Sequence, residues 1–420
     1  MKPEIKQRIE QLNNGKIPKG YKKTDFGVFP SDWETDKTLG DLFDFYGGLS
    51  KSRDELGEEG YAYLHYGDLH RGTFNTVSID HYEQLPKCDI SLTGKEKCLM
   101  KDGDVAFLDA SEDLEGTSRA VLIDNPENKP FIAGLHIIYG KAKNNSLDKW
   151  FKQYITSSES VKKQFQRLSV GFKVYGVNRD TIPRIRVSFP SSLKEQSRIA
   201  EILMKWDKAI ELYDKQIDAL TRYKAVCLRK MFPAKGKNIP EWRFQGFTDA
   251  WEQRKLGDIL QTLPFKAYLK SPEQDGRYEI VQQGSDPIIG YANGEPCRDY
   301  KNTVIFGDHT LSLYKPKKPF FVATDGVRIV KGSEKMDGNY LLPLLERNKP
   351  QSEGYKRYYS ILADIDVFFT ENHEEQSKIG EYFSELDHLI TLHQRKKETI
   401  INQRKALQRY LLNGIVRVKS

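Results

Sequence analysis

The sequence has 420 residues, with 66 basic and 59 acidic side chains and a formal net charge of +7. This length predicts two or three domains. An aromatic content of 11% excludes wholesale disorder, no stretch approaches the roughly 20 apolar residues of a membrane helix, and the start has no apolar signal region. Four cysteines without a CxxC pair indicate neither a disulfide framework nor a zinc site. Together these features lead us to expect a soluble, cytoplasmic protein without membrane contact. Its excess of basic side chains permits a nucleic-acid partner.

The N-terminal segment, residues 1–27, resembles the other end of the chain. IEQLNNGKI (Ile9–Ile17) is similar to LQRYLLNGIV (Leu407–Val416), and both contain the pair Asn-Gly. We therefore expect a helical segment that packs near the C-terminal helix and gives the chain a circular organisation.

Residues 28–188 are predicted to form a first globule of mixed α/β structure. Runs such as YAYLHYGDL, DVAFLD and FIAGLHIIYG are separated by Gly, Asp and Asn, as expected for short strands joined by turns. A helical insertion is expected over Leu147–Phe165, and the alternating run RIRVSFP (Arg184–Pro190) predicts a final strand.

Residues 189–238 are predicted to form a long helix. Apolar or aromatic residues recur with alternating spacings of four and three, which is typical of a coiled-coil seam. The seam positions are Ile199, Leu203, Trp206, Ile210, Tyr213, Ile217, Leu220, Lys224, Cys227 and Met231. A helix of about 40 residues is roughly 60 Å long.

The second half of the chain repeats this order, with a second globule over residues 239–367 and a second long helix over 368–420. WETDKTLGDL, which begins at Trp33, recurs as WEQRKLGDI from Trp251, and EQSRI (Glu195–Ile199) recurs as EQSKI (Glu375–Ile379). The run DIDVFFT (Asp364–Thr370) matches RIRVSFP. The second seam reads Ile379, Phe383, Leu386, Ile390, His393, Lys397, Ile400, Arg404, Leu407 and Leu411. Such a recurrence in the same order indicates two copies of one unit.

These patterns predict an α+β fold in which two mixed α/β globules are separated by two long helices. A short heptad run is more often an ordinary core helix, but two equivalent seams that follow equivalent globules favour an antiparallel coiled coil with a pseudo-twofold internal repeat. The side chains expected to form the coiled coil and to dock partners are Ile199, Leu203, Trp206, Ile210, Ile217, Leu220, Ile379, Phe383, Leu386, Ile390, Ile400 and Leu407.

No motif of an enzyme stands out. The sequence contains no P-loop, no G-x-G-x-x-G, no nucleophile elbow and no HExxH. A nuclease-like set from Pro30 to Lys37 has no equivalent in the second copy, where Thr248 and Ala250 replace Pro30 and Asp32, so packing explains that segment better. His65 and His70 with Asp68 lack a third ligand of metal-site spacing and are interpreted as solvated or DNA-facing side chains. We expect no catalytic residue and no metal site.

The segments FPSDWETDKTLGDLF, GFTDAWEQRKLGDIL, FPSSLKEQSRIAEIL and FFTENHEEQSKIGEYF resemble the specificity (S) subunit of type I restriction-modification enzymes. WDKAIELYDKQIDALTRYKAVCLRKMF is similar to the first helical region of that family. The resemblance covers essentially the whole chain. One departure is that FTEN (Phe369–Asn372) replaces the usual proline-rich segment before the second long helix.

The resemblance implies a non-catalytic subunit with two target-recognition domains, at 28–188 and 239–367, each reading half of a bipartite double-stranded DNA target. The helical spacers would fix the length of the unread sequence, at most about 18 base pairs at about 3.4 Å each for a helix of about 60 Å. The resemblance also implies docking of modification (methyltransferase) subunits, in two copies, and of a restriction/translocase subunit. This chain would carry no cofactor, with S-adenosylmethionine, ATP and Mg in the partners.

DNA contacts are expected in loops that combine cationic, amide and aromatic side chains. Arg and Lys suit guanine or phosphate, and Asn and Gln suit adenine. The candidates are Lys51, Arg53, Tyr66, His70, Arg71, Lys173, Tyr175, Asn178 and Arg179 in the first globule, and Gln282, Gln283, Lys315, Lys317, Lys318, Lys356 and Arg357 in the second. Any one of them alone is more often a solvated surface side chain.

Two alternative functions remain at this point. The chain could be a coiled-coil scaffold whose globules bind ligands other than DNA, which predicts binding that does not depend on salt. It could also be a stand-alone DNA methyltransferase or nuclease, which would require S-adenosylmethionine binding or metal-dependent cleavage by the isolated chain.

Overall fold

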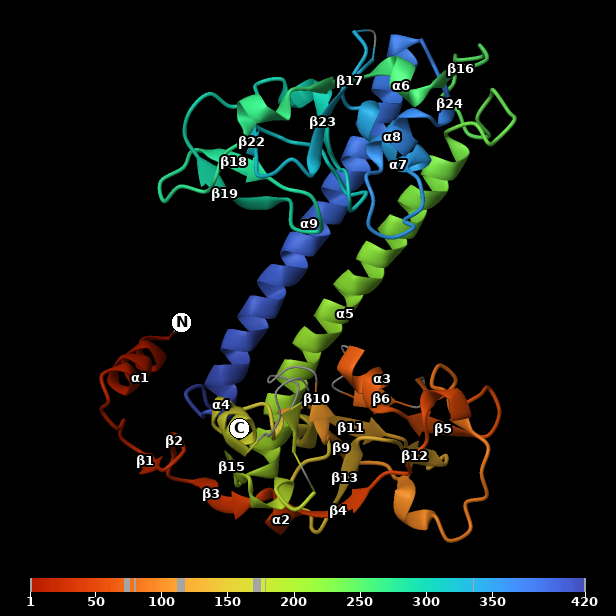
Figure 1. Cartoon of the computed structure of the whole chain (residues 1–420). Coiled ribbons are helices and arrows are strands. Elements are labelled where there is room, and N and C mark those ends of the chain that lie inside the picture. The colour runs from red at the N-terminus through yellow and green to blue at the C-terminus, as the bar shows by residue number, and fades with distance from the viewer. Residues whose placement is uncertain are drawn as a thin grey trace. The chain divides into compact units, whose positions relative to one another are not determined.

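The computed structural model describes residues 2–71, 76–78, 81–111, 118–168, 175–177, 179–334 and 336–418. The chain divides into two compact units, each described here by itself. Unit 1 comprises Met1–Leu212 and Lys397–Ser420, and unit 2 comprises Tyr213–Lys396. Each unit therefore contains one globule together with parts of both long helices, α5 (Leu193–Lys230) and α9 (His373–Leu412) (Figure 1).

The globule of unit 1 is built on two main sheets. The larger sheet has the strand order β4-β13-β9-β11-β6, and the smaller has the order β7-β5-β12-β8. Their strands are β4 (Phe43–Gly47), β5 (Tyr61–Leu64), β6 (Thr76–Ser78), β7 (Lys87–Cys88), β8 (Leu99–Met100), β9 (Val105–Leu108), β11 (Ala120–Asp124), β12 (Phe131–Ala133) and β13 (Ile137–Ala142). Three two-stranded pairings complete the unit: β1 (Tyr21–Thr24) with β2 (Gly27–Pro30), β3 (Trp33–Thr38) with β15 (Arg186–Pro190), and β10 (Ala110–Ser111) with β14 (Tyr175–Gly176).

The helices of unit 1 are short apart from the two long ones. They are α1 (Pro3–Asn13), α2 (Leu39–Leu42), α3 (Tyr66–Arg71) and α4 (Glu159–Leu168), with a 3₁₀ turn over Phe151–Tyr154. The helical insertion expected over Leu147–Phe165 is present as two separate pieces, the 3₁₀ turn and α4. Asp148 accepts hydrogen bonds from the backbone N–H groups of Trp150 and Phe151, which starts the 3₁₀ turn, and Ser158 precedes a separate helix, α4.

The globule of unit 2 is smaller and is also built on two main sheets, of four and three strands, with one further pair of strands. Its sheets are β17-β23-β20-β21, β19-β18-β22 and β16-β24. The elements are β16 (Glu252–Lys255), α6 (Leu256–Ile259), β17 (Leu260–Leu263), β18 (Tyr278–Val281), β19 (Ile288–Ala292), β20 (Thr303–Gly307), β21 (Leu313–Tyr314), β22 (Phe320–Val322), β23 (Val327–Gly332), α7 (Leu341–Asn348), α8 (Tyr359–Ala363) and β24 (Asp366–Phe369). The strands expected within RIRVSFP and DIDVFFT are confirmed as β15 and β24.

Within each unit the long helices run antiparallel. In unit 1 the start of α5, with Ile199 and Leu203, shares a core with Leu411 at the end of α9. In unit 2 the end of α5, with Cys227, shares a core with Phe383 near the start of α9. All the predicted seam positions on both helices are buried or half-buried. No described helix combines the length and apolar composition that a membrane-crossing segment requires.

Polar seam positions on the long helices form ion pairs within each unit. In unit 1 Arg404 lies 2.8 Å from Asp207, whose other oxygen accepts a hydrogen bond from Tyr154 of the globule at 2.7 Å. In unit 2 Lys224 lies 2.7 Å from Asp387 and 2.6 Å from Glu346 of the globule. Each ion pair therefore joins both helices to the globule of its own unit.

The recurring Glu-Gln pair explains how each globule is attached to its helix. Gln196 donates to the carbonyl of Pro190 at 2.8 Å and accepts from the backbone N–H of Asp148 at 2.7 Å. Gln376 makes the equivalent bonds to the carbonyl of Thr370 and the N–H of Asp337. Both glutamines are buried, so each bond replaces one that the backbone would otherwise make with water.

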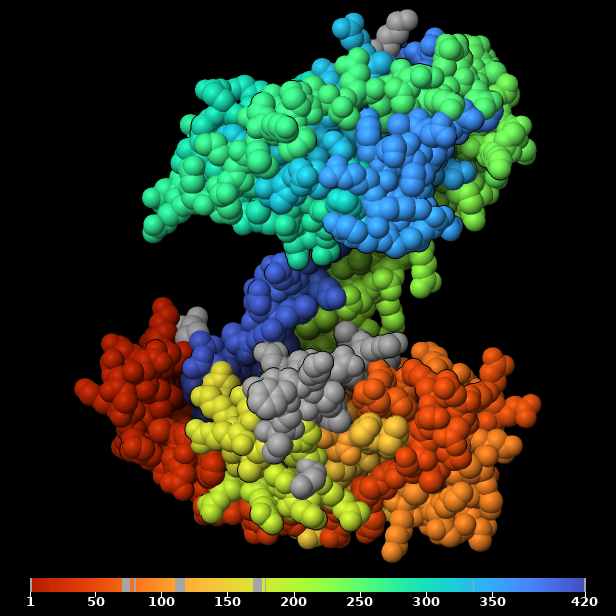
Figure 2. Space-filling view, in the orientation of Figure 1, coloured from red at the N-terminus to blue at the C-terminus, as the bar shows by residue number. Residues whose placement is uncertain are grey.

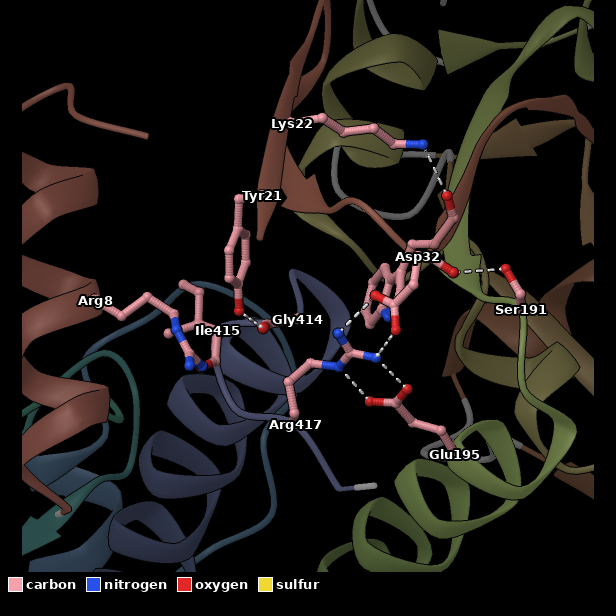
Figure 3. A network of polar contacts seen from close by, with 10 residues as sticks. Arg8, Tyr21, Lys22, Asp32, Ser191, Glu195, Gly414, Ile415 and Arg417 are labelled. Atoms are coloured by element: carbon pink, nitrogen blue, oxygen red, sulfur yellow. Dashed lines mark hydrogen bonds and ion pairs between the residues drawn. The ribbon is translucent and has the colours of Figure 1, made fainter. Parts of the chain in front are cut away.

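The glutamate that precedes each of these glutamines forms an ion pair with an arginine. Glu375 is fully buried and binds the guanidinium of Arg243 through two contacts of 2.7 and 2.9 Å. Glu195 binds Arg417 in the same two-contact manner, and Arg417 also reaches Asp32 (Figure 3). The burial and the paired geometry make these the strong class of ion pair.

The two ends of the chain meet in unit 1. Arg8 donates to the carbonyl of Ile415, and Tyr21 donates to the carbonyl of Gly414 (Figure 3). Gly414 adopts φ +65° just after α9, and a Cβ atom there would lie 2.4 Å from Pro30, so only glycine fits this close approach. In Figure 2 the N-terminal segment, in red, lies against the blue end of α9.

Candidate nucleic-acid interface

Four loops of unit 2 meet around the buried carboxylate of Asp308. They are residues 282–286 after β18, 308–312 after β20, 323–326 before β23, and 353–358 before α8; we call this set the unit 2 face. The N–H of Asp308 donates to the carbonyl of Gly326, and its own carbonyl and carboxylate accept from the N–H groups of Tyr358 and Tyr359. The guanidinium of Arg328 neutralises the carboxylate at 3.1 Å.

Gln283 and His309 lock two of these loops together. The N–H of His309 donates to the side-chain carbonyl of Gln283 at 3.1 Å. The Gln283 amide lies so close to Gly326 that a Cβ atom on that glycine would be 2.4 Å from Nε2. His309 Nδ1 lies 3.1 Å from the carbonyl of Lys356. Because a carbonyl only accepts, Nδ1 carries the proton in this contact.

The outer surface of the unit 2 face combines an aromatic ring with two cations. The Tyr355 ring stacks on the His309 imidazole with centroids 4.5 Å apart and planes 6° from parallel. Lys356 pairs with Glu353 at 2.6 Å, and Arg357 pairs with Asp325 at 3.5 Å. These ion pairs are largely exposed and therefore weak, so both cations can exchange their partners for phosphate oxygens.

The described part of unit 1 has loops at the equivalent strand ends. Asp109 follows β9 as Asp308 follows β20; its N–H donates to the carbonyl of His136, and its carbonyl accepts from the N–H of Val177. The side chains of Asp109 and His136 lie 2.8 Å apart. Residues 65–68 follow β5, as 282–286 follow β18. We call residues 65–68, Asp109, 134–136 and Val177 the unit 1 face.

Aromatic and imidazole rings dominate the unit 1 face. The ring of Tyr66 lies 4.5 Å from that of His65 and 5.3 Å from that of His136. His65 is buried, and this burial, with the nearby Arg53 as a smaller cause, lowers its pKa. Its imidazole Nδ1 accepts from the N–H of Gly67 at 3.1 Å. Arg53 pairs with Asp68 at the edge of the face.

The structure brings together several of the candidate DNA-binding residues. Gln282, Gln283, Lys356 and Arg357 share the unit 2 face, and Tyr66 and Arg53 lie at the unit 1 face. His70 and Arg71 end α3, but their side chains, the side chain of Tyr175, and the whole of Lys173 and Asn178 lie outside the described residues.

Other candidates lie elsewhere. Lys51 pairs with Glu55 at 2.7 Å across a 3₁₀ turn, and this contact raises the pKa of Lys51. Arg179 is exposed beside Gly47, the last residue of β4.

Lys315 has a role that the sequence interpretation did not foresee. Its ammonium donates to the backbone carbonyls of Lys301 and Gly338, and burial lowers its pKa to about 8. It therefore holds two loops of the globule together instead of presenting a charge at a basic turn. Its neighbours Lys317 and Lys318 are exposed.

Sequence reasoning missed His309, Tyr355 and Asp308. A usable signal was present, because the runs VAFLD and VIFGD place an aspartate directly after the equivalent strands β9 and β20. Within the described ranges, no group of three or more His, Cys, Asp or Glu side chains could hold a metal ion.

Comparison with known proteins identifies the family. Residues 30–222 match the family model of the type I restriction modification DNA specificity domain. The putative type I restriction enzyme MjaX specificity subunit of Methanocaldococcus jannaschii is 22% identical over 95% of this chain and 97% of its own length. Along almost its whole length, the chain is thus similar to type I specificity subunits. The MjaVIII specificity subunit of the same organism is 24% identical over 93% of this chain and 94% of its own.

Solved structures agree on the fold. The crystal structure of a type I restriction-modification S subunit from M. genitalium superposes with a TM-score of 0.59 at 17% identity, covering 90% of this chain and 96% of that one. A chain from a structure on complex assembly and conformational transition of the type I R-M system gives a TM-score of 0.50 at 13% identity, covering 92% of this chain and 99% of its own. Type I specificity subunits are the non-catalytic DNA-recognition subunits of their systems, so the chain is a recognition subunit and not an enzyme.

Proposed function

We propose that this specificity subunit reads a bipartite DNA target, with one half-site for each unit face. The observation that carries the proposal is that loops at equivalent strand ends bear different chemistry in the two units. His65 and Tyr66 follow β5, where Gln282 and Gln283 follow β18. Because each base pair presents a distinct donor and acceptor pattern in the major groove, faces with different side chains suit different half-sites.

The long helices are proposed to form an antiparallel coiled coil that sets the unread spacer between the half-sites, on a pseudo-twofold internal repeat. Support comes from their ion pairs, since Asp207 with Arg404 in unit 1 has the same form as Asp387 with Lys224 in unit 2. A buried polar residue in a coiled-coil seam fixes the register and orientation of the helices. The helices would thus pair in one register only.

The reactions are proposed to take place in partner subunits. Two modification subunits would supply methyl transfer from S-adenosylmethionine, and a restriction/translocase subunit would supply ATP- and Mg-dependent translocation and cleavage. The part of this chain would be to select the DNA and recruit those subunits. The buried seam residues, such as Ile199 and Phe383, hold the helices together, so partners would dock on exposed positions of the same helices.

The DNA-binding role can be tested on the complex of this chain with its modification subunits. The target is first mapped from methylated adenines in the host genome. The double variant Lys356→Ala/Arg357→Ala should weaken target binding and reduce the slope of log K against log salt by about one for each lost phosphate contact. Lys235→Ala/Lys237→Ala, which removes two exposed lysines outside the unit 2 face, is the charge-matched control.

Two results would count against the proposal. Binding that does not change with salt would favour a scaffold whose globules bind other ligands, because phosphate contacts always carry a salt dependence. Equal losses in the two double variants would show that only the total charge matters. As a second arm, replacing residues 252–367 by those of a relative should change one half-site and leave the other intact.

The spacer can be tested by inserting seven residues in each helix, between Asp207 and Lys224 in α5 and between Asp387 and Arg404 in α9. Both ion pairs are then kept, while the helices lengthen by roughly 10 Å, about three base pairs. The preferred spacer should grow accordingly with both half-sites unchanged. A spacer that stays the same, or half-sites that change, would contradict the ruler role of the helices.

A further inference from the structure

The side chain of Tyr355 is exposed to an unusual degree for an aromatic residue. It is 87% exposed, whereas the next most exposed large hydrophobic side chain in the described part of the chain, Leu212, is 55% exposed. An aromatic ring gains most from burial among the side chains, so a ring presented to water at a binding face indicates a contact surface.

The ring is nevertheless held in one place. It lies flat on His309, whose Nδ1 is bonded to the carbonyl of Lys356 and whose backbone N–H is bonded to Gln283. Gln283 in turn fits against Gly326 and Gly307 without room for a side chain on either glycine. Tyr355 therefore rests on a histidine that is itself bonded to Gln283 and Lys356, which favours one position of the ring before any ligand arrives and reduces the entropy lost on binding.

This geometry restricts what the ring can touch. An aromatic wedge between two stacked bases needs both of its faces, but one face of Tyr355 is stacked on the His309 ring. The free face and the edge can instead contact the floor of a groove. The adjacent cations Lys356 and Arg357 are suited to the flanking phosphates. Among the groups on the major-groove floor, the apolar one is the 5-methyl group of thymine.

We propose that Tyr355 is a base-contacting residue, whose ring packs against the 5-methyl group of a thymine in the half-site read by unit 2. This rests on the proposed function of the unit 2 face. His309 is a positioning residue that holds the ring. The tyrosine hydroxyl is not required, so Tyr355→Phe should bind like the parent protein.

The test is a double-mutant cycle that combines substitutions in the protein with base replacements in the DNA. It uses the complex and its mapped target. Each thymine of the unit 2 half-site is replaced in turn by deoxyuridine, which lacks only the methyl group. At one position the replacement should weaken binding by the parent about fourfold, the effect of burying one methyl group at ~0.8 kcal/mol. The same replacement should have no effect on Tyr355→Ala. His309→Ala should show a reduced methyl effect, because the ring loses its support.

Tyr291→Ala, which removes a half-exposed tyrosine from β19, is the matched control and should keep the full methyl effect. The inference is overturned if no thymine shows coupling to Tyr355, if the half-site contains no thymine, or if Tyr355→Ala weakens target and scrambled DNA equally. A parent complex that does not discriminate the mapped target from scrambled DNA would instead refute the proposed function. Because Tyr355 is exposed, circular dichroism should show an unchanged fold in all variants.

Discussion

The ion pair between Arg243 and Glu375 gives the sharpest test of which contacts attach a globule to its long helix. The change is Arg243→Ala in unit 2. The Glu375 side chain is 0% exposed and that of Arg243 is 13% exposed, and two hydrogen bonds of 2.7 and 2.9 Å join them. Removing the guanidinium leaves a carboxylate inside the protein without its cation.

The expected loss follows from that burial. Breaking a buried ion pair by removing one partner costs about 3–5 kcal/mol of unfolding free energy, because the remaining charge stays desolvated. Arg254→Ala is the matched control, since the pair of Arg254 with Glu252 is about half exposed and should contribute no more than about 1 kcal/mol. Adding Glu375→Gln to Arg243→Ala should recover part of the loss, because a neutral amide is easier to bury than a carboxylate.

Urea unfolding followed by tryptophan fluorescence measures the loss, with Trp251 as a buried probe in the same unit. Hydrogen exchange at the start of α9 shows whether unit 2 opens by itself, since two units need not unfold together. The reasoning fails if Arg243→Ala costs no more than Arg254→Ala. It also fails if Glu375→Gln makes the Arg243→Ala protein less stable.

Three further changes have outcomes that follow from single contacts. Burial raises the pKa of Asp104 to about 6, so the folded state retains a proton between about pH 4 and 6 and stability falls as the pH rises through that range. Asp104→Asn should therefore stabilise the protein above pH 6 by up to about 3 kcal/mol, with no gain below pH 4, in thermal unfolding at a series of pH values. Gln376→Ala should cost about 1–3 kcal/mol in urea unfolding, because a buried backbone donor and a buried acceptor lose their partner. Arg404→Ala should cost about 3 kcal/mol and speed hydrogen exchange at the end of α9. Replacing both Arg404 and Asp207 by leucine should restore only part of it, because the buried Tyr154 hydroxyl then lacks its acceptor.

The long helices were predictable because one physical rule governs their whole length. A side chain every three or four residues must face the partner helix, and this periodicity is visible without knowing the partner. The polar seam positions Lys224 and Arg404 look like defects in such a pattern. In the structure they are ion-paired to Asp387 and Asp207, and sequence spacing along one helix carries no information about a partner on the other.

The unit 2 face was only partly predictable, because its contacts join residues that are far apart in the sequence. Its loops are separated along the chain by strands of different length, and they meet only because those strands lie in two sheets. Gln283 and Arg357 could be proposed from composition, but the support of Tyr355 by His309 depends on a contact between residues far apart in sequence. Lys315 shows the opposite error, because a lysine in the basic run before Pro316 is expected to be exposed until its carbonyl partners are known.

The residues that carry the internal repeat are therefore different from the residues proposed to read the target. Gln196 and Gln376 recur because each must bond a backbone carbonyl at the end of a strand and a backbone N–H in a loop, a requirement that no DNA sequence affects. Tyr355 instead contacts only the His309 ring among the contacts described here, and its side chain is 87% exposed. Under the proposed function, an exposed side chain of a face such as Tyr355 can therefore be changed without loss of stability, provided that Asp308, the Gln283–His309 contact and the Glu-Gln pairs are kept.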